Sequence, residues 1–348
     1  SAYAQLRQME YLDRGVVAVK TNNGIFLSWR ILGTEKNASF NVYKNGKLFQ
    51  SVAANKATNL IDPSGTINDR YTVKAVTNGQ EEQNSKEITP WAEEFLTIQL
   101  NRPADGITPP CITYNRAKRP PIAQEYPNGQ LYTYIPGDCS TGDLDGDGEY
   151  EIIVKWCPSN QVDNSFSGIT GPVYLDAYKL NGKQLWRINL GKNIRAGSHY
   201  TQFMVYDFNG DGLAEMICKT APGSIDGKGK KIALDKDDPD KDWRYLEMNQ
   251  KTCGYILEGP EYLTIFKGKT GEELHTIPYS TERGEVNSWG DNYGNRVDRY
   301  LACVAYLDGV HPSVIMCRGY YAKTTLTAYD FKNGKLVKRW EHISDIKG

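Results

Sequence analysis

Leu175-Asp176-Ala177-Tyr178-Lys179-Leu180-Asn181-Gly182-Lys183-Gln184-Leu185-Trp186 is the stretch that decides the fold of this 348-residue chain. It has the pattern of a hydrophobic strand, a turn and a second strand, and the pattern returns at 263–275 and 326–340. An Asn-Gly or Thr-Gly pair at each turn permits positive φ and closes a hairpin. Another strand pair precedes each copy, and four strands per repeated unit predict the blades of a β-propeller.

The predicted fold class is all-β, in two domains. Residues 1–100 contain short alternating strands between Asn-Gly turns, which is typical of a β-sandwich of fibronectin III-like type. Residues 101–348 contain the first blades of the propeller. Three units can be counted, whereas about four to eight blades are needed to close a propeller. We therefore expect further blades in a longer native protein.

Two acidic loops occupy matching positions in the first two units, at 143–151 and 207–215. Each has oxygen ligands at positions 1, 3, 5 and 9, a glycine at position 6, and a backbone carbonyl expected from position 7. Such a density of carboxylates requires a hard cation, so the loops predict two calcium sites. The predicted ligands are Asp143, Asp145, Asp147, Glu149, Glu151, Asp207, Asn209, Asp211, Leu213 and Glu215. The ions are expected to be structural.

An EF-hand and a third ion are both excluded by the sequence. An EF-hand requires Glu at position 12 and flanking helices, whereas here position 12 is Val154 or Cys218 and the flanks are strand-like. The third copy, around Asp308, has lost the ligand pattern.

Composition and the N-terminal residues limit which binding partners and which cellular compartment are expected. A net charge of −1 gives no reason to expect nucleic acid, and no run approaches the ~20 apolar residues of a membrane span. We interpret Ser1 as a mature terminus left after removal of an export signal, so the protein is expected to be secreted, periplasmic or cell-surface, and a monomer. Seven cysteines without a C-x-x-C pair argue against zinc. They are interpreted as small buried hydrophobes, with one or two disulfides left open.

Polar and aromatic side chains gather in the turns between the predicted strands. Each of them alone is most simply a solvated surface group. Together they place cations, amides and aromatic rings near strand ends, which suits the binding of an acidic sugar. The candidate substrate contacts are Asn160, Asp163, Asn164, Arg195, Trp289 and Tyr320.

Several runs, among them 142–152, 171–178, 190–197 and 199–203, resemble the family 11 polysaccharide lyases, the bacterial rhamnogalacturonan lyases. The resemblance extends over nearly the whole chain. It implies an eight-bladed propeller, calcium ions, and β-eliminative cleavage of the rhamnose–galacturonate backbone of pectin (rhamnogalacturonan I). Members of the family are longer than this chain, in agreement with the blade count.

Such a lyase needs a base to remove the C5 proton of galacturonate and a cation to neutralise the charge that develops. His199 is the first candidate for the base, and Tyr200, Lys219 and Arg318 are candidates for the acid or the charge-neutralising group. The alternative is a non-catalytic, calcium-stiffened propeller that binds glycan or protein, as FG-GAP-type adhesion propellers do. It explains the acidic loops equally well but leaves the polar clusters unexplained.

Overall fold

The computed structural model describes residues 7–344, apart from 9, 11, 34, 36, 83, 84 and 117. Strands dominate it, and the single helix in this described part is the short 3-10 helix η1 (Val286–Trp289). The all-β prediction is therefore confirmed. The chain divides into two compact units, Tyr11–Gln99 and a second unit that joins Ser1–Glu10 to Leu100–Gly348.

No helix in the described residues is long and apolar enough to span a membrane.

The Tyr11–Gln99 unit consists of two antiparallel sheets, β1-β2-β5 and β4-β3-β6-β7. Inward-facing residues of both sheets, such as Leu27, Val42 and Val73, form one core, so the unit is a sandwich. The strands are β1 (Val17–Thr21), β2 (Gly24–Ser28), β3 (Ser39–Lys44), β4 (Lys47–Val52), β5 (Asn59–Asp62), β6 (Tyr71–Thr77) and β7 (Gln80–Glu81).

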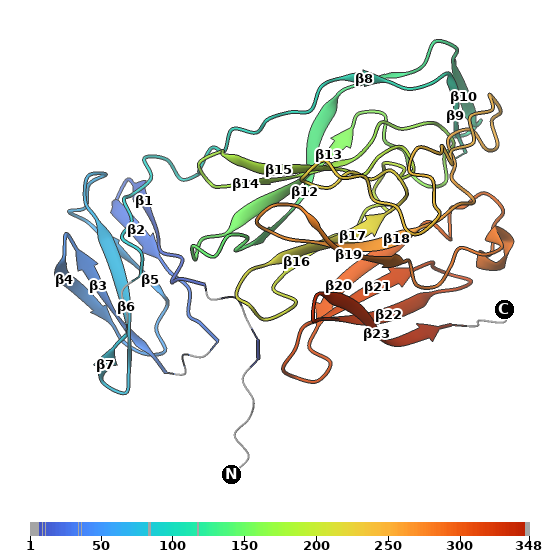
Figure 1. The fold of residues 1–348 in the computed structure, drawn as a ribbon. Coiled ribbons are helices and arrows are strands. Elements are labelled where there is room, and N and C mark those ends of the chain that lie inside the picture. Colours follow the sequence, from blue (N-terminus) through green and yellow to red (C-terminus); the bar gives the residue numbers. More distant parts are fainter. Residues whose placement is uncertain are drawn as a thin grey trace. The chain divides into compact units, whose positions relative to one another are not determined.

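The second unit contains three four-stranded antiparallel sheets in which the strand order follows the chain (Figure 1). The first sheet is β12 (Tyr134–Gly142), β13 (Glu151–Pro158), β14 (Tyr174–Tyr178) and β15 (Gln184–Asn189). The second is β16 (Phe203–Tyr206), β17 (Glu215–Thr220), β18 (Tyr262–Phe266) and β19 (Glu273–Pro278). The third is β20 (Tyr300–Ala305), β21 (Ser313–Arg318), β22 (Thr325–Lys332) and β23 (Lys335–Ile343). Two short pairs precede them: β8 (Gly106–Ile107) with β11 (Leu131–Tyr132), and β9 (Cys111–Asn115) with β10 (Ile122–Tyr126).

The three sheets pack against one another through apolar side chains. One core cluster joins Leu175 of the first sheet to Met216 and Phe266 of the second. Another joins Ile217 of the second sheet to Met316 of the third. The second strand of each sheet lies in the middle of this packing, which explains why β13 and β17 are buried on both faces. The long stretch between β17 and β18 forms no helix or regular strand, as the sequence predicts.

The N-terminal residues belong to the second unit, whereas the sequence placed them in the sandwich domain. The Gln8 N–H donates to the carbonyl of Val310 at 2.8 Å, and the Tyr306 hydroxyl donates to the Gln8 carbonyl. Glu10 lies beside the first acidic loop, close to Gly142. A repeat-based sequence argument could not find these pairings because they join residues about 300 positions apart.

All seven cysteines are free, so none of the disulfides left open by the sequence is present. Cys111, Cys157, Cys218 and Cys253 are buried, as expected of small hydrophobes. Cys139 and Cys303 are exposed, and for these two the prediction of burial is wrong. They lie on β12 and β20, which are edge strands of their sheets.

Candidate functional site

The first acidic loop connects β12 to β13. The Asp143 carboxylate accepts the N–H of Gly146 at 2.7 Å and that of Gly148 at 2.9 Å. Glu151 accepts the N–H of Leu144 at 2.8 Å, which ties the end of the loop to its start. Both glycines have φ of 84°, a conformation that side chains disfavour. The turn residues thus wrap the backbone around the carboxylates.

The second acidic loop, between β16 and β17, repeats these hydrogen bonds position by position. Asp207 accepts the N–H of Gly210 at 2.7 Å and that of Gly212 at 2.9 Å. Glu215 accepts the N–H of Phe208 at 2.9 Å. The two loops therefore share one pattern of hydrogen bonds, as the matched sequence pattern predicted. The glutamate at position 9 stabilises the loop and also offers a ligand oxygen.

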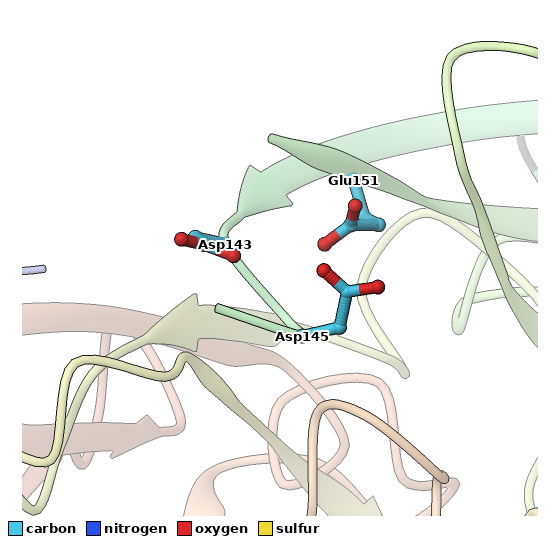
Figure 2. A group of neighbouring side chains, drawn as sticks. All are labelled: Asp143, Asp145 and Glu151. Atoms are coloured by element: carbon cyan, nitrogen blue, oxygen red, sulfur yellow. The ribbon is translucent and has the colours of Figure 1, made fainter. Parts of the chain in front are cut away.

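The acidic side chains of the first loop converge as metal ligands would (Figure 2). Ligand oxygens of Asp143, Asp145 and Glu151 all lie within 4.8 Å of one another. Asp145 Oδ1 is buried and has no hydrogen-bond partner among the described residues. An unsatisfied buried carboxylate oxygen in a ring of carboxylates suits a hard divalent cation. The residues therefore fit a divalent metal ion.

Burial makes these carboxylates difficult to ionise without a cation. Burial, together with the neighbouring charges of Asp211 and Asp207, raises the pKa of Glu215 to about 8. Burial likewise raises the pKa of Glu151. Glu10, which the sequence analysis missed, has its pKa raised to about 7 by burial and by the charges of Asp143 and Asp207.

Lys179, also missed by the sequence analysis, brings a positive charge to the first loop. Its Nζ lies 2.7 Å from Asp145, 2.9 Å from Asp147 and 3.5 Å from Glu151. Lys179 is the first residue after β14, and the turn pattern that defined the repeat already contained it. Its role depends on the pairing of β14 with β13, which the sequence alone does not reveal.

The remaining predicted ligands lie at the rim of the loops. Asp147 accepts the N–H of Glu149, and Asp211 accepts the N–H of Leu213, each at 2.9 Å. In the second loop Asn209 donates to Glu215 at 2.8 Å. In the third copy, Asp308 instead pairs with His311 at 2.8 Å.

At the opposite end of the strands, three side chains form a partly exposed group that we call the surface triad: Asp163, His199 and Arg299. His199 Nε2 lies 3.6 Å from the Asp163 carboxylate, and Arg299 lies 3.9 Å from it. The Arg299 guanidinium also stacks 4.2 Å from the ring centre of Tyr320. Asp163 follows β13, His199 precedes β16 and Arg299 precedes β20, so the three sheets converge here.

The charges of the surface triad suit proton transfer. Burial and the positive charge of Arg299 lower the pKa of His199, and the charge of Asp163 only partly opposes this. His199 is therefore neutral at pH 7 and can accept a proton. Burial acts to raise the pKa of Asp163, but hydrogen bonds from Ser165 and the charges of His199 and Arg299 hold it below its usual value. Arg299 was missed, although it directly precedes a strand.

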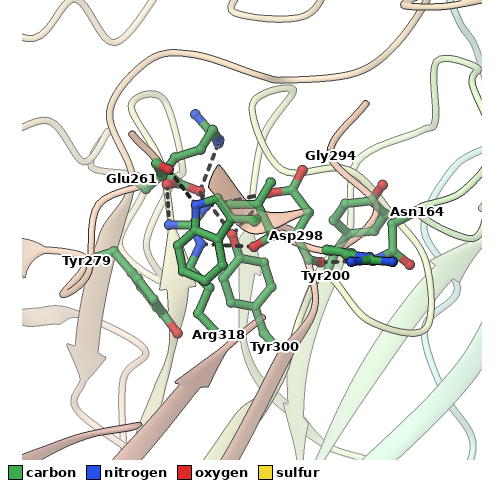
Figure 3. A network of polar contacts seen from close by, with 12 residues as sticks. Asn164, Tyr200, Glu261, Tyr279, Gly294, Asp298, Tyr300 and Arg318 are labelled. Carbon is green, nitrogen blue, oxygen red and sulfur yellow. Dashed lines mark hydrogen bonds and ion pairs between the residues drawn. The ribbon is translucent and has the colours of Figure 1, made fainter. Parts of the chain in front are cut away.

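Lys219 and Arg318 lie in a buried ion network, of which Figure 3 labels Arg318, Glu261 and Asp298. One carboxylate, Glu261, pairs with Arg318 at 2.8 Å, Arg283 at 2.8 Å and Lys219 at 3.1 Å. Arg318 is 0% exposed and also donates to the Val297 carbonyl at 2.9 Å. Both predicted cations are therefore already paired and out of contact with solvent.

The other predicted contacts brace the loops. The Tyr200 hydroxyl accepts a hydrogen bond from Arg195, and burial raises the pKa of that phenol well above its usual value. Arg195 also donates to the Gly168 carbonyl at 3.0 Å. The amide of Asn164 donates to the Asn295 carbonyl at 2.8 Å.

Asn160 and Trp289 behave in the same way. Asn160 accepts the Gly171 N–H at 3.0 Å, and the Trp289 indole donates to the Arg283 carbonyl at 2.7 Å. Among the predicted substrate contacts, Asp163 is a member of the surface triad, and Tyr320 stacks on Arg299 of the triad. Sequence could place polar residues on these loops, but it could not distinguish those that hold a loop from those that face solvent.

Two family models match the chain. Residues 7–91 match the rhamnogalacturonan I lyases beta-sheet domain. Residues 97–348, well over half of the chain, match the C-terminal domain of rhamnogalacturonan lyase family 11.

Two proteins of Bacillus subtilis (strain 168) are similar along the whole chain. The rhamnogalacturonan endolyase YesW is 54% identical over 344 residues, which are 98% of this chain and 51% of YesW. The rhamnogalacturonan exolyase YesX is 51% identical over 343 residues, 98% of this chain and 52% of YesX. This chain thus spans about half the length of these relatives.

Solved structures agree. The crystal structure of the exotype lyase YesX matches with a TM-score of 0.86 and 50% identity, over 99% of this chain and 53% of that one. The Bacillus licheniformis rhamnogalacturonan lyase matches with a TM-score of 0.85 and 52% identity, over 99% of this chain and 55% of that one. The resemblance seen in the sequence is confirmed, and the chain belongs to family 11 of the rhamnogalacturonan lyases.

Proposed function

We propose that this chain acts within a lyase that cleaves the rhamnose–galacturonate backbone of rhamnogalacturonan by β-elimination. Family membership supports the substrate and the reaction class, and the surface triad is the observation that carries the proposal. One similar protein is named an endolyase and the other an exolyase, at nearly equal identity. The proposal therefore concerns the cleavage reaction and does not distinguish endo from exo cleavage.

In this proposal His199 is the base. Its neutral imidazole takes the C5 proton of galacturonate, a C4–C5 double bond forms, and the C4–O bond to the leaving sugar breaks. The leaving oxygen keeps the electron pair of that bond and takes a proton from water. Asp163 orients the imidazole from 3.6 Å. Arg299 supplies the positive charge that binds the galacturonate carboxylate and stabilises the charge that develops on it. Tyr320, stacked on Arg299, offers a ring for the sugar face.

Lys219 and Arg318 receive a different role. Because both pair with Glu261 and Arg318 is fully buried, we assign them to positioning the loops that carry the triad. The Tyr300 N–H donates to the His199 carbonyl at 3.1 Å, and the Tyr300 hydroxyl donates to Glu261 at 3.0 Å. The network thus reaches the main chain of the proposed base.

Calcium in the two acidic loops is part of the same proposal. When bound, it would neutralise the carboxylates of each loop and hold together the first two strands of the first and second sheets. The loops lie at the opposite end of the strands from His199, which supports a structural rather than a catalytic ion. The sequence of three similar sheets, whose first strands are neighbours, supports propeller blades. Export and a monomeric state remain proposals made from sequence.

Incubation with rhamnogalacturonan, followed by the ultraviolet absorbance of the unsaturated uronate product, tests the reaction. The assay uses the longest natural protein that contains this chain. His199→Gln should lower kcat by about 10²- to 10⁴-fold. The matched control is His311→Gln at the loop end, which should leave kcat unchanged. A His199→Gln variant with the parent rate would exclude His199 as the base.

The rival, a calcium-stiffened adhesion propeller, is less well supported. It predicts saturable glycan binding without any unsaturated product. The family match and the exposed imidazole between a carboxylate and a guanidinium favour the lyase.

A further inference from the structure

A second concave site lies apart from the surface triad. It is a cavity of about 940 Å³ at the start of β18 and the end of β19. Its lining, all within the described residues, includes none of Asp163, His199 and Arg299. β18 and β19 are the last two strands of their sheet, whereas His199 and Arg299 precede first strands. The cavity is therefore displaced from the triad towards the other edge of the second sheet.

The lining of the cavity is negatively charged. Four carboxylates, those of Asp235, Asp237, Glu258 and Glu282, face one lysine, Lys236. The two remaining charged lining residues, Glu261 and Arg283, pair with each other at 2.8 Å and belong to the buried ion network, in which Glu261 also pairs with Lys219 and Arg318. Such an excess of negative charge repels a further carboxylate. A galacturonate residue is therefore a poor occupant.

The uncharged part of the lining suits the C–H face of a sugar. Apolar side chains of Leu234, Leu257, Pro260 and Pro278 line the cavity together with the ring of Tyr279. Apolar walls with a few polar groups are typical of ligand sites. The carboxylates are acceptors for sugar hydroxyls, and hydrogen bonds to charged groups are the stronger kind.

One buried donor in the lining lacks a partner. Arg283 is 6% exposed, and its Nη2 is paired with Glu261. Its Nε is buried and has no hydrogen-bond partner among the described residues. Because this atom has less than 1 Å² of accessible surface, it is out of reach of an occupant of the cavity. The groups available to a sugar are therefore the carboxylates and the apolar side chains of the lining.

We propose that this cavity binds neutral glycosyl residues, and that on the polysaccharide it receives a neutral branch rather than the acidic backbone. If the galacturonate that is cleaved lies at the triad, near the first strands, a branch is the part of the polysaccharide that would occupy a cavity at the last strands of the second sheet. The proposal rests on the proposed function only for the identity of the polysaccharide. Binding of a neutral oligosaccharide can be measured without cleavage.

Isothermal titration calorimetry at constant calcium with two probes, β-1,4-galactotetraose and trigalacturonic acid, tests the proposal. Galactotetraose should bind with a Kd on the order of 1 mM, and the His199→Ala variant should bind it equally well. The double variant Glu258→Gln/Glu282→Gln should weaken this binding about tenfold, because each change removes a charged acceptor. The matched control is Glu285→Gln, an exposed neighbour that makes no cap hydrogen bond and lies outside the lining.

Three results would overturn the proposal: no saturable binding of galactotetraose, unchanged binding by the double variant, or equal loss on Glu285→Gln. Trigalacturonic acid should bind at least about tenfold more weakly at this cavity, since repulsion worth ~1.4 kcal/mol changes a binding constant tenfold. Displacement of galactotetraose by trigalacturonic acid at equal concentration would contradict the charge argument. Loss of lyase activity with neutral-sugar binding intact would count against the proposed function alone.

Discussion

The effect of Glu215→Gln on folding stability should have opposite signs in calcium-free and calcium-loaded protein. Glu215 is 4% exposed and accepts hydrogen bonds from Phe208 and Asn209. Its pKa of about 8 means that ionisation in the folded, metal-free protein is opposed by burial first and by neighbouring charges second. Glutamine has the same shape without the charge. In calcium-free buffer at pH 8 the variant should therefore be at least as stable as the parent.

In the presence of calcium the parent should be more stable than the variant. An ion at a hundredfold excess over its Kd stabilises the folded protein by about 2.7 kcal/mol for each site. For a domain of this size, each kcal/mol raises Tm by roughly 2–4 °C, so one loop contributes about 5–11 °C. The parent has two such loops, and the variant keeps only the first. Its calcium-induced rise in Tm should therefore be smaller by about that amount.

Differential scanning calorimetry with and without calcium measures both effects. The control is Asp308→Asn in the third copy, where His311 already pairs with the carboxylate. This change should lower Tm equally in both buffers and leave the calcium-induced rise intact. A Glu215→Gln protein with the full calcium-induced rise would refute the assignment of the second loop as a calcium site.

Other buried charges give further expectations. In calcium-free buffer the free energy of unfolding should fall as pH rises from about 5 to 8, because folded Glu215 holds a proton that the unfolded chain has released over that window. Denaturant midpoints at both ends of the window check this, and equal midpoints would contradict it. Glu261→Gln should cost about 3–5 kcal/mol in urea unfolding, since it removes the carboxylate shared by the buried cations Arg318, Arg283 and Lys219. The exposed control Glu272→Gln should stay within about 0.5 kcal/mol. Lys179→Met should raise the calcium affinity of the first loop about fivefold, roughly 1 kcal/mol, by removing an ammonium that competes for Asp145. Calcium titration measures this affinity, and an unchanged affinity would show that Lys179 does not compete with calcium for Asp145.

Local pattern predicted the fold well because the repeat is local. Each Asn-Gly or Thr-Gly turn fixes a hairpin, and alternating or continuous apolar runs assign the strands around it. The acidic loops could be predicted for the same reason, since Asp143 and Glu151 are eight residues apart in sequence. What could not be predicted depends on pairings between distant segments.

The candidate site shows where the sequence argument stops. Loop composition identified His199 and Asp163, and the structure brings them to 3.6 Å. It also identified Arg318 and Lys219 as available cations, because no local signal reveals that both pair with Glu261, which is 57 residues from Arg318. Burial depends on the packing of three sheets, so a cation in a loop and a cation in the core look alike in one sequence.

The docking of Gln8 on Val310 and Tyr306 has a consequence for the order of folding. This contact joins residues 298 positions apart, so it has one of the largest loop-closure costs in the chain. During synthesis the first residues emerge early but cannot find their partners until the third sheet has been made. High contact order of this kind slows folding and leaves the segment unprotected meanwhile. Sequence fused directly ahead of Gln8 should therefore impede a late step in folding.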